Sequence, residues 1–182
     1  MENGTAQARA LLARLNADDI PHPGGTLLAH CERVRARLST WGARPALQLA
    51  GLCHAFYGTD GFPSALLPSA RRHELREAVG EEAEAIVYLY GSCDRKATYP
   101  RLRADLNSPF RNRFTSRDEH ASPLRARDFA DLTAANELDL AAHDPTFHAH
   151  HAPALLALFT DLRPLLSPPA WQDCERVLGG ER

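Results

Sequence analysis

The sequence predicts an all-α protein, and three observations carry this prediction. Apolar residues recur at intervals of three and four over long stretches, which is the spacing of one face of an α-helix. Strict alternation of apolar and polar residues never persists and β-branched residues are scarce, so no convincing strand is indicated. Glycine and proline stand between the periodic stretches, where they end helices. We therefore expect one compact helical bundle.

The predicted elements follow from these signals in chain order. A leucine-rich stripe predicts a helix over residues 5–17, with Thr5 as its N-cap. After a Pro- and Gly-rich break, a second helix over residues 26–41 places His30 on its inner stripe, while Arg33 and other charged residues face water. The third helix, residues 44–57, is almost wholly apolar up to His54, so we expect it to be buried on most sides.

The second half of the chain is read in the same way. Further helices are expected at residues 70–79, 81–90, 123–142, 153–162 and 169–178. Residues 92–122 are the least regular, and loops or short helices that cover an opening are expected there. The His-rich tract of residues 143–151 reads as a polar break between helices.

Composition narrows the classes of function. A chain of 182 residues can bury roughly 70% of its unfolded surface as one domain, here residues 1–182. The net charge of −2 gives no field that would recruit nucleic acid or an anionic membrane. The four cysteines form no C-x-x-C pair, and no apolar run approaches the roughly 20 residues of a membrane span. We expect a cytoplasmic protein with a small-molecule substrate and no nucleic-acid or membrane partner, and a homodimer stays open.

Two histidines and an aspartate are the candidate metal ligands. His30 and His54 lie on consecutive helices joined by a short connection, which favours antiparallel neighbours with both imidazoles inward. Asp131, on the inner side of the helix predicted at residues 123–142, can add an oxygen. Two histidines and one carboxylate suit zinc, manganese or iron as the divalent metal. The alternative is that both histidines are hydrogen-bonded core residues and that Asp131 is a buried cap or the partner of an arginine.

Three segments of the chain stand out: HAFYGTD at residues 54–60, VGEEAEAIV at residues 79–87 and FADLTAAN at residues 129–136. Together they resemble motifs of the HD-domain superfamily of metal-dependent phosphohydrolases, in particular its alarmone (guanosine tetraphosphate) hydrolase branch. A narrower resemblance is to an uncharacterised HD-like family with the motif H-x-x-Y-G-T-(E/D)-G-F, here at residues 54–62. The resemblance implies an HD-like core over about residues 24–142, with C-terminal helices at 153–178 packing on it.

The resemblance also implies a reaction. It predicts a phosphoester or nucleotide-like substrate and hydrolysis by water that is activated at a metal held by His30, His54 and Asp131. However, Ala55 stands where the family has its metal-binding aspartate, and Asn136 is one residue later than the family spacing. Asp60 is the nearby acid that could take the aspartate's role and orient water.

Four other residues are weaker candidates. The hydroxyls of Tyr57 and Thr59 could orient water or a ligand, or could stabilise the turn that follows His54. Arg71 and Arg72 could bind a phosphate or carboxylate of the substrate, or could form a solvated face.

Two other function classes remain open beside hydrolysis. One is a non-haem iron oxygenase or lyase, and the other is a non-catalytic helical module that binds a metabolite or protein.

Overall fold

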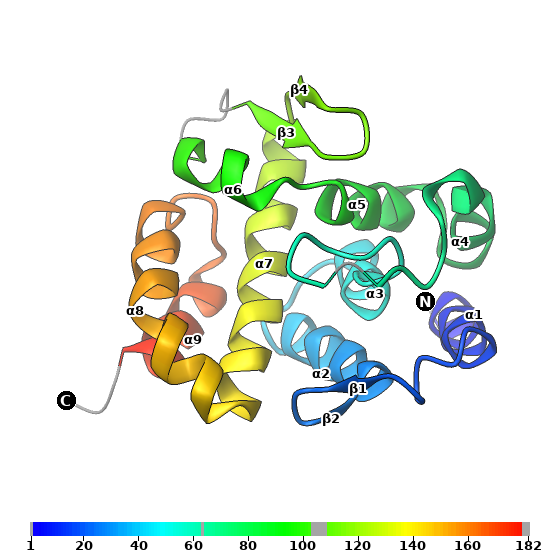
Figure 1. The fold of residues 1–182 in the computed structure, drawn as a ribbon, viewed down its shortest axis with the longest axis horizontal. Coiled ribbons are helices and arrows are strands. Elements are labelled where there is room, and N and C mark those ends of the chain that lie inside the picture. Colours follow the sequence, from blue (N-terminus) through cyan, green and yellow to red (C-terminus); the bar gives the residue numbers. More distant parts are fainter. Residues whose placement is uncertain (1, 63, 103–108, 180–182) are drawn as a thin grey trace.

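The computed structural model describes residues 2–62, 64–102 and 109–179, and the all-α prediction is confirmed (Figure 1). The described α-helices are α1 (Glu2–Arg14), α2 (Leu27–Thr40), α3 (Pro45–Cys53), α4 (Arg72–Val79), α5 (Glu81–Gly91), α6 (Arg95–Thr98), α7 (Pro123–His143), α8 (Pro145–Asp161) and α9 (Pro168–Leu178). Two short 3₁₀ helices, η1 (Ser69–Arg71) and η2 (Tyr99–Arg101), precede α4 and follow α6. No helix of the described part is both long and apolar enough to cross a membrane.

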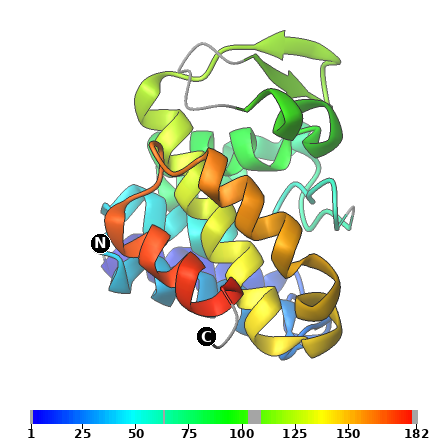
Figure 2. The same ribbon diagram turned by 90° about the vertical axis from the view of Figure 1, so that its left-hand side faces the viewer.

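Helix α7 is the central element of the fold. It packs against α2, α3 and α5 on one side and against α8 and α9 on the other (Figures 1 and 2). Every residue from Asp128 to Asp139 is buried as a result, including three aspartates, an asparagine and a glutamate. Burying so many polar groups is costly unless each has a partner. These polar side chains therefore need hydrogen-bond or ion-pair partners inside the fold.

Helices α2 and α3 pack at close range because of one glycine. A Cβ atom at Gly51 would lie 2.5 Å from Cδ1 of Leu38 and 3.5 Å from Cα of Arg35. Glycine inside a helix costs about 1 kcal/mol relative to alanine, and the close contact between the two helices offsets this cost. The close packing lets Gly51, near the end of α3, lie against Arg35 and Leu38 of α2.

Three details differ from the sequence-based expectations. Thr5 lies inside α1 rather than at its start, because the helix begins at Glu2. Two antiparallel strand pairs are present, β1 (Pro21–His22) with β2 (Gly25–Thr26) and β3 (Phe110–Asn112) with β4 (Arg117–Glu119). Strands of two or three residues are too short to produce a recognisable alternation.

The third difference is the His-rich tract, which is helical. Asp144 caps α8 by accepting hydrogen bonds from the backbone N–H groups of Thr146 and Phe147, and Pro145 occupies the first turn. The imidazole of His148 bonds to the carbonyl oxygen of Val177 at the end of α9 (2.9 Å). Packing against α9 therefore stabilises a helix where the local sequence predicted a break.

Candidate metal centre

The two predicted histidines come together where α2, α3 and α7 meet. His30 lies on the inner face of α2, and His54 directly follows the last residue of α3; they are 1% and 2% exposed. Their Nε2 atoms are 3.1 Å apart. Asn136 of α7 adds its Oδ1 atom, 3.1 Å from Nε2 of His30. Three polar atoms from three parts of the fold thus converge at one buried point.

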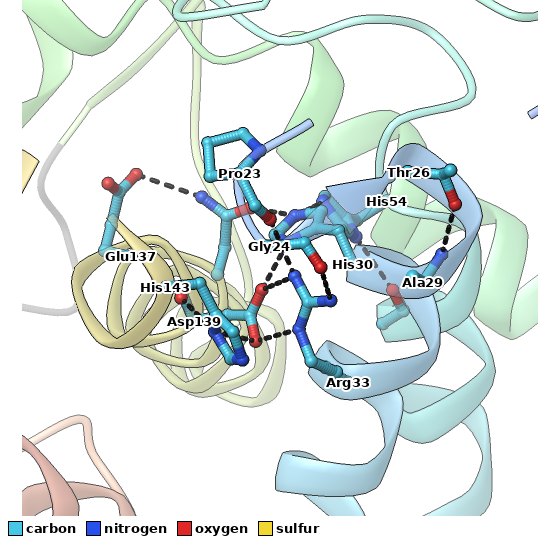
Figure 3. A network of polar contacts seen from close by, with 12 residues as sticks. Pro23, Gly24, Thr26, Ala29, His30, Arg33, His54, Glu137, Asp139 and His143 are labelled. Carbon is cyan, nitrogen blue, oxygen red and sulfur yellow. Dashed lines mark hydrogen bonds and ion pairs between the residues drawn. The ribbon is translucent and has the colours of Figure 1, made fainter. Parts of the chain in front are cut away.

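The other ring nitrogen of His30 is held by a carboxylate. Nδ1 of His30 lies 2.6 Å from Oδ2 of Asp139 on α7. Asp139 also accepts hydrogen bonds from Nε and a terminal nitrogen of Arg33, at 2.8 and 2.9 Å, as Figure 3 shows. Burial by itself would raise the pKa of Asp139, but the hydrogen bonds from His30 and Arg33 outweigh it and lower the pKa to about 2. The carboxylate is therefore ionised and requires a hydrogen on Nδ1 of His30.

Nδ1 of His54 is also committed to an acceptor. It donates to the carbonyl oxygen of Gly51, one turn earlier in the chain, at 2.8 Å. Burial and the neighbouring His30 lower the pKa of His54 to about 3, so the ring is neutral at physiological pH. A neutral imidazole with its hydrogen on Nδ1 has a lone pair on Nε2. Nε2 of His54 is therefore an acceptor.

Asn136 presents a third acceptor to the same point. Its Nδ2 donates to Oε1 of Glu137 at 3.1 Å, which turns Oδ1 toward the histidines. With Nδ1 of His30 donating to Asp139, a neutral His30 also turns a lone pair on Nε2 toward this point. Buried acceptors that face one another without a donor cost about 1–3 kcal/mol each. A cation, either a metal ion or a proton on His30, is needed to stabilise the arrangement.

The spacing of these atoms fits a metal ion. Ligand atoms about 2.1 Å from one ion lie about 3.0 Å apart at right angles and about 3.4 Å apart in a tetrahedron. The two measured separations, both 3.1 Å, fall within this range. Each histidine also donates the hydrogen of its other ring nitrogen, Nδ1, to an oxygen acceptor, which is the usual support of a metal-binding imidazole. The donor set therefore suits a divalent cation.

A pocket of about 280 Å³ opens onto this point. Its apolar walls come from six side chains of the β1–β2 hairpin, α2, α7, α8 and the loop after α3: Pro21, Pro23, Leu27, Phe62, Leu140 and Phe147. His22, on β1, lines the pocket and stacks on His30 with ring centroids 4.1 Å apart. Nδ1 of His22 is buried without a hydrogen-bond partner among the described residues, and burial lowers the pKa of this ring to about 4.

One ion pair forms the polar wall of the pocket. The guanidinium of Arg95 lies 2.8 Å from Oε1 of Glu137 and donates to the hydroxyl of Tyr90 at 2.9 Å. Oε1 of Glu137 therefore accepts from both Arg95 and Asn136. Within the described part of the chain, Oε2 of Glu137 has no hydrogen-bond partner. It is not one of the fully buried side-chain atoms that lack a partner. A pocket-lining residue thus has one carboxylate oxygen without a hydrogen-bond partner among the described residues.

The structure does not bring Asp131 to this point, and its assignment as a metal ligand is corrected. Oδ1 of Asp131 accepts the backbone N–H of Ser167, the residue before α9, at 2.9 Å. Asp131 precedes Asn136 by five residues, which on a helix means about 140° of rotation and about 7.5 Å of translation. Within the described ranges, no three or more His, Cys, Asp and Glu side chains are grouped to hold a metal ion. The third atom at the convergence point is instead the amide oxygen of Asn136.

The acid expected to orient water also lies elsewhere. Asp60 is exposed, and its Oδ2 accepts the backbone N–H of Arg95 at 2.9 Å, so it supports the start of α6. Tyr57 donates its hydroxyl to the buried carboxylate of Glu84 at 2.8 Å, and burial raises its pKa. Neither residue lines the pocket, whereas Thr59 does, although its hydroxyl oxygen also accepts the N–H of Phe62 at 3.0 Å.

The two arginines expected to bind substrate are paired with acids away from the pocket. Arg71 pairs with Glu74 on the surface. Arg72 pairs with Glu84, at 2.6 and 2.9 Å, and its guanidinium lies 3.6 Å above the ring of Tyr88. Neither arginine lines the pocket, so a role in binding a ligand there is not supported.

Sequence reasoning missed most of the supporting residues. Asn136 and Asp139 are three residues apart and so share one face of α7. His30 and Arg33 have the same spacing on α2, where Arg33 was expected to face water. An i, i+3 pair on each helix is a signal that could have linked them, but it is common on helix surfaces. Glu137 and Arg95 carried no recognisable signal.

Comparison with known proteins gives one match. Residues 11–95 are similar to a family model described as a domain of unknown function (DUF6817). No curated protein and no solved structure matches the chain. The matched residues include His30 and His54 and end before α7, so two of the three converging atoms lie within the match and Asn136 lies outside it.

Proposed function

We propose that this protein is an HD-like, metal-dependent enzyme that hydrolyses a small molecule in the cytoplasm. The observation that carries the proposal is that Nε2 of His30 lies 3.1 Å from both Nε2 of His54 and Oδ1 of Asn136, and that all three atoms are acceptors when His30 is neutral. A divalent cation held there would lower the pKa of water to near 7 and polarise an oxygen of the substrate. The four free cysteines, all buried, are consistent with a reducing compartment.

The roles of the protein groups follow from their contacts. Asp139 and Arg33 fix the tautomer and orientation of His30, and the Gly51 carbonyl does the same for His54. Glu137 is the one acidic residue among the described residues that line the pocket, and Arg95 holds one of its oxygens. The other oxygen is positioned to orient a water molecule and accept its proton. Glu137 thus takes the role that the sequence suggested for Asp60.

Metal content tests the first half of the proposal. Protein purified without a histidine tag is expected to contain close to one equivalent of zinc, manganese or iron by elemental mass spectrometry. His54→Ala and Asn136→Leu are expected to lose it, because each removes one converging atom. Asp131→Asn is the matched control on α7 and is expected to keep the metal. A folded wild-type protein without metal after incubation with each ion would contradict the proposal.

Activity tests the second half. Hydrolysis of chromogenic p-nitrophenyl esters is expected to depend on the bound metal and to fall by about 10²–10⁴-fold in Glu137→Gln, which is the usual effect of losing a general base. This variant is expected to keep its metal, because Glu137 contacts the site only through the amide of Asn136. Asp60→Asn is the control and is expected to retain activity. Equal rates for wild type and Glu137→Gln would rule out the role assigned to Glu137.

A further inference from the structure

Apart from the proposed cation, the described lining of the pocket lacks the protein groups that bind phosphate. Its permanently charged lining residues, within the described ranges, are Arg95 and Glu137, and they pair with each other at 2.8 Å. No other arginine or lysine of the described chain lines it. A nucleotide phosphate chain carries several negative charges and is normally held by free cationic side chains or by the N–H groups at a helix start. The described lining offers no free cationic side chain, because Arg95 is paired with Glu137.

The N-termini of α2 and α8 beside the pocket do not offer free N–H groups to a phosphate either. Phe147 lies in the first turn of α8, where the side chain of Asp144 accepts the N–H groups of Thr146 and Phe147, at 2.9 and 3.0 Å. Leu27 lies in the first turn of α2, where the hydroxyl of Thr26 accepts the N–H of Ala29 at 3.2 Å. The capping side chains occupy N–H groups that a phosphate would need, and Asp144 adds a repelling negative charge.

The rest of the pocket is suited to an apolar body. Proline, leucine and phenylalanine side chains form the walls opposite the converging acceptors. At about 280 Å³ the pocket is at the lower end of the roughly 300–1,000 Å³ of sites for drug-sized ligands. A ligand that fits has one polar end, which faces the convergence point, and a compact apolar remainder between Phe62, Leu140 and Phe147.

We infer that the ligand of this pocket is a compact organic molecule with an aromatic or branched apolar body and a single polar group carrying at most one negative charge. Nucleotides and other polyphosphates are therefore not the expected substrates, because the described lining offers no free cationic side chain for them. This inference rests on the proposed function, because the polar group is assigned to the metal at His30, His54 and Asn136. It also replaces the nucleotide-like substrate that the sequence resemblance implied.

Calorimetric titration of the metal-loaded full-length protein tests the inference, with phenylacetate, ADP and inorganic phosphate as probes. Phenylacetate is expected to bind at least tenfold more tightly than ADP or phosphate. Leu140→Gln, which puts a polar group in the apolar wall, is expected to weaken phenylacetate binding by about tenfold or more. Leu124→Gln is the matched control, since Leu124 lies on the same helix but is 53% exposed and outside the pocket.

The outcomes separate the inference from the proposed function. If the protein binds metal but prefers ADP or phosphate, or if Leu140→Gln and Leu124→Gln bind phenylacetate equally, the ligand class is wrong and the metal site stands. If metal content shows no bound ion in folded wild-type protein, the proposed function fails and the inference fails with it.

Discussion

The side chain that fixes the chemical state of the site is Asp139. Its ionised carboxylate, with a pKa of about 2, accepts a hydrogen bond from Nδ1–H of His30, so a neutral His30 has its lone pair on Nε2. Arg33 holds the same carboxylate and also donates to the carbonyl oxygens of Pro23 and Gly24 in the β1–β2 hairpin, at 2.9 and 3.1 Å. Arg33 therefore connects the pocket wall to the orientation of His30.

Replacing Asp139 tests this link. Asp139→Asn is expected to lower metal affinity by about 10–100-fold, because the amide no longer fixes the tautomer of His30 or raises its basicity. Asp173→Asn is the control. Asp173 also pairs with an arginine of α2, but this arginine, Arg37, lies further along the helix, away from the site. Competition with a metal-sensitive chelator dye measures both affinities. Unchanged affinity in Asp139→Asn would show that His30 does not depend on Asp139.

For single residues, the sequence predicted that the two histidines face inward, but not which side chains hold them in place. The apolar stripe of α2 correctly placed His30 inward. Arg33 was expected in water because charged residues on a half-exposed helix usually are, but a long side chain can pass along the surface and reach a buried acid. Its side chain is 25% exposed, so the sequence alone could not distinguish the two cases.

Among the elements, α7 shows why Asp131, rather than Asn136, was expected to face the two histidines. Its residues are buried on nearly all sides between two groups of helices, so its sequence has no polar face that would reveal which side contacts α2. Asp131 and Asn136 were both visible as polar residues among alanines. Which of them faced the histidines depends on the rotation of the helix, which is set by packing and not by the local pattern.

The stability of Asp131 variants provides a test at this scale. Burial raises the pKa of Asp131, so its ionised form is disfavoured in the fold relative to the unfolded chain. The destabilisation is present at neutral pH and disappears as pH falls toward the unfolded pKa, about 4. Asp131→Asn keeps an acceptor for the N–H of Ser167, so at pH 7 it is expected to be as stable as wild type or more so.

Urea unfolding at pH 7 and pH 4 measures this effect. The difference in unfolding free energy between Asp131→Asn and wild type is expected to be larger at pH 7 than at pH 4. A variant that is less stable at pH 7 and has also lost its metal would show that the carboxylate of Asp131 is needed at the site after all.

On the scale of the whole molecule, the site depends on segments far apart in the chain. The segment similar to the family of unknown function, residues 11–95, carries both histidines but not α7, which packs against α2, α3 and α5. The all-α class could be predicted because helical spacing is a local property. The position of α7 between two layers of helices could not, because it depends on contacts between distant residues.

A fragment of residues 1–102 tests this dependence. It is expected to lack stable tertiary structure and to bind no metal, because removing α7 exposes the inner faces of three helices and removes both Asn136 and Asp139. Circular dichroism during thermal unfolding and elemental mass spectrometry measure the two properties. A cooperative unfolding transition with stoichiometric metal in this fragment would contradict the role given to α7.

The central claim is that a divalent cation lies between His30, His54 and Asn136, and anomalous X-ray diffraction from crystals grown with zinc or manganese tests it most directly. The expected result is an anomalous peak about 2.0–2.3 Å from Nε2 of both histidines and from Oδ1 of Asn136. A structure without a peak there, in which a hydrogen bond joins His30 to His54, would contradict the claim and identify both histidines as core residues.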